Sequence, residues 1–137
     1  MEATWVAIKA ELHGSGMPCA EADIILRAGQ ILGWIRESPS DARAEQEQAL
    51  QSLLSGARRS ALAEYNEAIE SDGTSELHWT RVSDRLAVVA DAMILGRCMY
   101  DVCRHLHDRA VDAAAQAVRI RRTVAVAREQ WGAYHGA

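Results

Sequence analysis

The side chains best placed to do chemistry together are Asp101, His105 and Asp108, which follow one another at steps of four and three residues. On a helix this spacing puts two carboxylates and an imidazole on one face. Carboxylate oxygens and imidazole nitrogens are common ligands of divalent metal ions. A metal-binding helix face is therefore one hypothesis. The alternative is an ordinary solvated face, because Arg104 precedes Asp108 by four residues and can form an ion pair with it.

Other chemical signatures are absent from the sequence. The glycine-rich stretch at residues 14–17 lacks the pattern of a phosphate-binding loop, and no G-x-S-x-G nucleophile elbow occurs. Cys103 falls on a predicted apolar stripe, where a thiol is expected to be buried and inert. We therefore expect no enzymatic activity and no cofactor.

Charge is unevenly distributed along the chain, whose net charge is −4. Residues 1–76 carry 6 basic and 13 acidic side chains, whereas residues 97–128 carry seven arginines and three aspartates. Such a separation predicts either that the two parts pack together or that a charged face is left for a partner. The candidate partner-binding side chains are the acidic Glu45, Glu47, Glu64 and Glu67 and the basic Arg119, Arg121, Arg122 and Arg128.

Nucleic-acid binding through the basic cluster is an alternative to binding another protein. Arg119 and Arg122 share one face of the predicted helix, however, while Arg121 and Arg128 share another. A helix that binds nucleic acid usually concentrates its basic residues on one side. The negative net charge points the same way, so we expect a protein partner rather than a nucleic acid.

The composition predicts an all-α fold. Alanine, leucine, arginine and glutamate are frequent, all of them strong helix formers, and Pro18 and Pro39 are the only prolines. A first helix is expected over Thr4–His13, and a second beginning at Pro18. Glycines four residues apart on this second helix, at positions 29 and 33, predict the close approach of a neighbouring helix. A long helix is expected over Pro39–Glu70, with Ser38 as its cap.

The second half of the chain is predicted to be helical from Leu77 to Trp131. Residues 71–75 have the composition of a turn, with Ser75 as the cap of the next helix. An apolar stripe then runs from Val82 to Gly96, where its phase changes, and a second stripe continues from Met99 to Trp131. At Gly96 either one helix bends or two helices meet. No β-strand is expected.

Together these elements predict one domain, residues 1–137, built as a helical bundle of four to five helices. Two long helices form a hairpin around Ser71–Ser75. Alanine at many stripe positions buries little area, so we expect the four tryptophans to anchor the core. These anchors are Trp5, Trp34, Trp79 and Trp131. A stripe of this length can also pack against a second copy of the chain, so a homodimer is an alternative to the monomer.

The sequence also bears on location. The N-terminus lacks a basic region followed by an apolar run, as a signal peptide would have, and no uncharged apolar stretch approaches the ~20 residues that span a bilayer. The three cysteines have no metal-binding or redox spacing and are expected to be reduced. We expect a cytoplasmic protein without a membrane segment.

In size, acidity and helical composition the chain is similar to the small helical proteins with which phages and other mobile elements inhibit host machinery, such as anti-CRISPR proteins. The similarity covers no motif and therefore implies no functional residues. It implies a non-enzymatic protein that binds another protein and blocks or regulates it.

Overall fold

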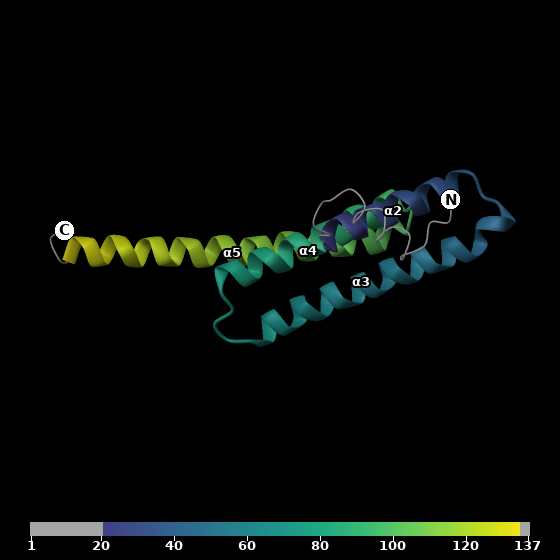
Figure 1. The fold of residues 1–137 in the computed structure, drawn as a ribbon. Helices are drawn as coiled ribbons and strands as arrows, with labels where there is room; N and C mark the ends of the chain where they lie inside the picture. The colour runs from purple at the N-terminus through teal and green to yellow at the C-terminus, as the bar shows by residue number, and fades with distance from the viewer. Residues whose placement is uncertain (1–20, 135–137) are drawn as a thin grey trace.

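The computed structural model describes residues 21–134, and every regular element in that range is helical. The elements are α2 (Glu21–Glu37), the 3-10 turn η1 (Asp41–Arg43), α3 (Ala44–Glu70), α4 (Glu76–Leu95) and α5 (Tyr100–Tyr134). Figure 1 shows α2, α3 and α4 packed into a body along which the first part of α5 runs, while the rest of α5 projects from one end. The predicted all-α bundle, with a hairpin formed by α3 and α4, is confirmed.

Part of the predicted N-terminal structure lies outside the described residues. This applies to the helix expected over Thr4–His13, to the expected helix start at Pro18 and to the anchor Trp5. Within residues 21–134, no helix combines the length and the apolar character needed to cross a membrane.

The core is aliphatic and follows the predicted stripes. Its largest fully buried side chains come from all four long helices: Leu32, Leu50, Leu54, Leu86, Leu106, Val82 and Val89. On α4 every stripe position from Val82 to Gly96 is buried. These helices therefore form because their apolar residues recur at the helical period and can be buried on one side.

Helices α2 and α4 approach each other closely where glycine was predicted to allow it. A Cβ atom at Gly29 would lie 2.1 Å from the backbone oxygen of Ala92, and one at Gly33 would lie 2.1 Å from that of Leu95. Both positions are buried. Only glycine lets the two backbones come this near, so the prediction of close helix approach is confirmed.

The caps of α3 and α4 differ from one another. The Ser75 hydroxyl accepts a 3.1 Å hydrogen bond from the backbone N–H of His78, which confirms it as the cap of α4. The expected cap at Ser38 is wrong, because the long helix begins later than predicted. The 3-10 turn comes first and is preceded by Ser40, whose side chain accepts no capping hydrogen bond from the described residues. Helix α3 itself starts at Ala44.

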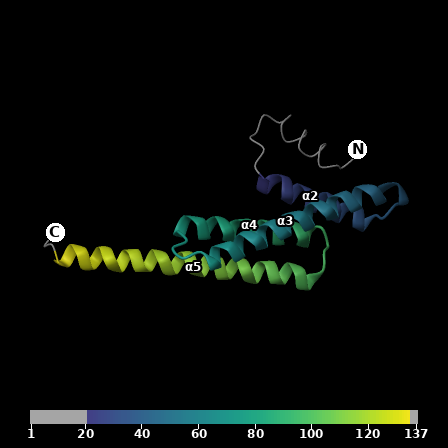
Figure 2. The same cartoon turned by 90° about the horizontal axis from the view of Figure 1, so that it is seen from below.

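Two helices meet at Gly96, rather than one helix bending there. The N–H groups of Arg97 and Cys98 donate to the carbonyls of Ile94 and Met93, the pairing of a Schellman motif. In that motif the residue after the cap adopts a left-handed conformation, which here is Arg97, with φ of 56°. Helix α5 then folds back antiparallel along α4, as Figure 2 shows.

Two expectations about burial are wrong. Among the described tryptophans only Trp79 is a core anchor, packed edge to face on Tyr65 with ring centroids 6.0 Å apart. Trp34 is 50% exposed beneath the Arg27 guanidinium, and Trp131 is 63% exposed. The α5 stripe is buried only from Cys103 to Ala117; its first member, Met99, and the positions from Val124 onward are exposed.

Candidate functional site

The three candidate metal ligands named from the sequence lie on the outer face of α5. Asp101, His105 and Asp108 are all exposed. Among residues 21–134, no three His, Cys, Asp or Glu side chains come together in a way that would hold a metal ion. The spacing does place these side chains on one face, but no side chain from a second helix completes a ligand set there.

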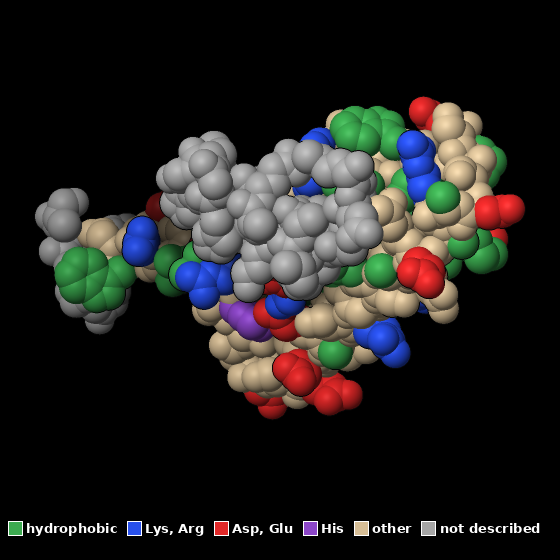
Figure 3. Space-filling model, turned by 45° about the vertical axis from the view of Figure 1, so that its right-hand side comes forward, with side chains coloured by type: hydrophobic (Ala, Val, Ile, Leu, Met, Phe, Trp, Pro, Cys, Tyr) green, Lys and Arg blue, Asp and Glu red, His purple; other side chains and the backbone are tan. Residues whose placement is uncertain are grey.

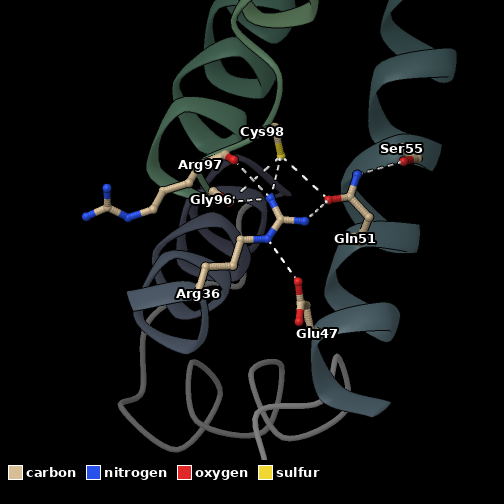
Figure 4. A network of polar contacts seen from close by, with 7 residues as sticks. All are labelled: Arg36, Glu47, Gln51, Ser55, Gly96, Arg97 and Cys98. Atoms are coloured by element: carbon tan, nitrogen blue, oxygen red, sulfur yellow. Dashed lines mark hydrogen bonds and ion pairs between the residues drawn. The ribbon is translucent and has the colours of Figure 1, made fainter. Parts of the chain in front are cut away.

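A polar network holds the α4–α5 turn against α2 and α3. The Arg36 guanidinium, at the end of α2, donates to the backbone carbonyls of Gly96 at 2.8 Å and Arg97 at 3.1 Å. It also donates to Glu47 at 3.1 Å and Gln51 at 2.8 Å, both on α3. Figure 4 shows how these groups surround one guanidinium. A planar fork of five N–H donors suits such a site, which satisfies carbonyls left open at the helix end.

Cys98 completes this network. Its Sγ atom lies 3.7 Å from Nη1 of Arg36 and 3.7 Å from Oε1 of Gln51. Cys103, five residues later, is buried in the core, and burial together with the nearby Cys98 raises the pKa of its thiol. The prediction that Cys103 is buried is thus confirmed, whereas the Arg36 network was not foreseen.

Two of the four acidic candidates are used within the fold. Glu47 pairs with Arg36, and Glu64 pairs with Arg85 at 2.9 Å. Arg85 also reaches Glu21 on α2 at 2.6 Å, so one arginine ties α2, α3 and α4 together. The other two candidates, Glu45 and Glu67, are exposed on α3.

The basic candidates divide in a similar way. Arg121 pairs with Glu76 at 2.6 Å, a contact between the basic and acidic parts of the chain, and Arg119 donates to Gln116 on its own helix. Within the part of the chain that the structure describes, Arg122 and Arg128 contact no carboxylate, and both are exposed. Basic residues thus outnumber acidic ones toward the end of α5, where Glu129 is the one acidic residue among residues 119–131.

The Arg121–Glu76 contact also marks where α5 leaves the body. Glu76 is the first residue of α4, so α5 has no α4 neighbour beyond Arg121. We call residues 122–132 the overhang; it continues the helix for about 15 Å at a rise of 1.5 Å per residue. Valines 124 and 126 in the overhang are 42% and 51% exposed. On the face in Figure 3, this end carries hydrophobic and basic side chains together with an acidic one, whereas most of the acidic side chains lie over the body.

A hollow lies at the base of the overhang. It is bounded by the end of α3, the α3–α4 turn and α5, has a volume of about 350 Å³, and is lined in part by Ile69, Trp79 and Ile120. A shallow hollow of about 410 Å³ continues along the overhang from Arg119 to Gln130. The two share Arg119. This surface could not be predicted from the sequence, because it depends on where the α3–α4 turn meets α5.

A third hollow gathers His78 with serine and glutamate side chains. It lies beside the start of α4 and has a volume of about 260 Å³. Its Ser75 hydroxyl accepts the backbone N–H of His78 and so caps the helix. This hydrogen bond gives the Ser75 hydroxyl a structural role as the cap of α4.

Comparison with known proteins returns no match among protein-family models, curated proteins or solved structures.

Proposed function

We propose that this chain is a non-enzymatic helical module that binds another protein and thereby regulates or inhibits it. The observation that carries the proposal is the overhang. It keeps a regular helix, exposed valines and arginines without a carboxylate contact among the described residues, beyond the end of the body. The body of the protein gains no packing from these side chains, whereas a partner laid against them would remove their apolar surface from water.

The polar groups of the body support the same proposal. Arg36 and Arg85 each join three segments through ion pairs and hydrogen bonds, so these charges serve the fold. Of the candidates that the fold leaves without an ion pair among the described residues, the acidic Glu45 and Glu67 lie on α3 and the basic Arg122 and Arg128 lie on the overhang. Segregated charge guides association and selects partners more than it adds affinity.

The test is affinity capture from nuclease-treated lysate of the source cells, with the full chain as bait. One variant reverses the acidic face (Glu45→Lys with Glu67→Lys) and another reverses the basic face (Arg122→Glu with Arg128→Glu). We expect a defined protein to be captured by the wild type and lost from at least one variant. All four positions are exposed, so both variants should fold. Retention of every captured protein by both variants would refute the proposal.

Nuclease treatment separates protein binding from its rival. A nucleic-acid binder would lose its captured material on digestion, and its binding would fall steeply with salt. A metal-dependent function would instead give stoichiometric metal in the purified protein, lost in Asp101→Ala or His105→Ala. Either result would replace the protein-binding proposal.

A further inference from the structure

We infer that the overhang and the hollow at its base form a docking site for an acidic amphipathic helix of the partner protein. This inference rests on the proposed function and specifies the chemistry of the partner. The site begins where α4 starts opposite Arg121, includes the hollow lined by Ile69 and Ile120, and extends along residues 122–132.

The first argument is the continuity of the α5 stripe. Ala110, Ala113 and Ala117 are buried, Ile120 is half-buried, and the next positions of the same stripe, Val124 and Ala127, are exposed. The spacing of three and four residues does not change along this series, so the overhang presents the pattern that packs against a helix in the body. Small side chains at these positions let a second helix approach closely. A helix is therefore the shape that the exposed stripe fits.

The second argument is charge. Residues 119–131 carry four arginines and a single carboxylate, that of Glu129. Arg121 and Arg128 are seven residues apart and flank the stripe on one side, and only Arg121 has a carboxylate partner among the described residues. A helix laid on the stripe would bring its own flanking side chains against Arg128. Glutamate or aspartate at those positions complements the site, whereas lysine or arginine is repelled.

A second copy of the chain does not fit as the occupant. Two overhangs paired antiparallel about Ala127 would set Arg128 of one copy beside Arg128 of the other. A parallel pair would instead set Arg128 of one copy opposite Thr123 of the other, so it would gain no ion pair. The overhang is short as well, about three helical turns, whereas stable interfaces bury about 800 Å² on each partner. An acidic partner avoids the repulsion between arginines. If it also fills the hollow, it buries more area than the overhang alone provides.

The experiment measures binding of two synthetic peptides to the full chain by fluorescence anisotropy. Both peptides are helical, about 20 residues long, with the same leucine and alanine stripe; one carries glutamate and the other lysine at the flanking positions. We expect the glutamate peptide to bind at least tenfold more tightly than the lysine peptide. Its affinity should fall as salt is raised, because the ion pairs are exposed.

Point variants locate the site. Val124→Asp interrupts the stripe and Arg128→Glu removes the complementary charge, and each should weaken binding of the glutamate peptide at least tenfold. The matched controls are Ala125→Asp, one residue away on another face, and Arg104→Glu, on the part of α5 within the body. These should change the affinity less than twofold. Circular dichroism and thermal unfolding of each variant verify that the helices are kept.

Three outcomes would overturn the inference. In the first, the glutamate peptide binds no better than the lysine peptide, or Val124→Asp leaves its affinity unchanged. In the second, a duplex DNA oligonucleotide binds with an affinity that Val124→Asp does not change, which would mean that the arginines bind phosphate groups. In the third, sedimentation shows a dimer that Val124→Asp dissociates, which makes a second copy the occupant. If cellular capture depends on Glu45 and Glu67 while these peptides fail, protein binding stands and only the overhang site is lost.

Discussion

The Arg36 guanidinium and the backbone carbonyl of Gly96 are joined by a 2.8 Å hydrogen bond across 60 residues of sequence. The bond links the last turn of α2 to the end of α4. Since Gly96 is buried, its carbonyl depends on this donor for a strong partner. The same guanidinium reaches Glu47 and Gln51, so a single side chain connects three helices at the point where the chain reverses.

Replacing Arg36 with methionine should lower the free energy of unfolding by about 2 kcal/mol, because hydrogen bonds from a charged donor are lost and buried acceptors are left unsatisfied. Arg36→Lys keeps the charge but not the planar fork, and should recover only part of this loss. Urea unfolding followed by circular dichroism measures both. Arg59→Met, at an exposed position on α3, is the control and should stay within about 0.5 kcal/mol of the wild type. Equal stability of Arg36→Met and Arg59→Met would contradict the assigned role.

Substituting alanine for glycine should have opposite signs at different helical positions. Gly29→Ala and Gly33→Ala put a methyl group 2.1 Å from a backbone oxygen of α4, so the helices must move apart and stability should fall by at least about 2 kcal/mol. Gly56→Ala on α3 meets no described atom within 4 Å and should stabilise the protein by up to about 1 kcal/mol. Thermal unfolding of the three variants checks this. The packing of α2 on α4 would be misassigned if all three shifted the midpoint alike.

The serines that precede α4 and the 3-10 turn, Ser75 and Ser40, should also respond differently to alanine. Ser75→Ala removes the hydroxyl that accepts the His78 N–H and should cost about 1 kcal/mol. Ser40→Ala removes a side chain that accepts no capping bond among the described residues, and should cost a few tenths at most. Chemical unfolding measures the difference. A larger loss at Ser40 than at Ser75 would mean that the start of the long helix had been wrongly placed.

The thiols of Cys98 and Cys103 should differ in their rates of alkylation. Burial raises the pKa of the Cys103 thiol above its ordinary value, so the reactive thiolate is scarce near neutral pH and the sulfur is also shielded. Cys98 is half-buried and accessible. In a Cys19→Ser background, iodoacetamide at pH 8 should modify Cys98 first, and labelling of Cys103 should go on increasing with pH beyond the point at which an unhindered thiol levels off. Mass spectrometry gives both rates, and equal rates in the folded protein would contradict the placement of Cys103. In urea the two rates should converge.

Local patterns in the sequence were sufficient to predict the helices of residues 21–134 and most of their buried stripes. The apolar stripe on α4 and the cap at Ser75 could be predicted because both depend on residues a few positions apart. The form of the break near Gly96 was left open, because the residue in the left-handed conformation is Arg97 and not the glycine beside it. Arginine rarely adopts this conformation, so residue type offered no signal.

The candidate site was harder to predict, because it depends on relative helix lengths. The stripe of α5 continues unchanged to Trp131, and periodicity alone predicts that all of it is buried. Burial ends near Ile120 because α4 begins opposite Arg121, a fact about a different part of the chain. The Arg36 network was missed for a related reason, since its partners are brought together only by the folded turn. A basic residue in the last turn of α2 was the one available clue.

The unequal lengths of α4 and α5, 20 and 35 residues, also affect how the molecule moves through solvent. A rod attached to a small body increases friction without adding much mass. A single copy should therefore elute from a sizing column ahead of a compact protein of the same weight, and could be mistaken there for a pair of chains. Light scattering, which reports mass without regard to shape, would distinguish elongation from association.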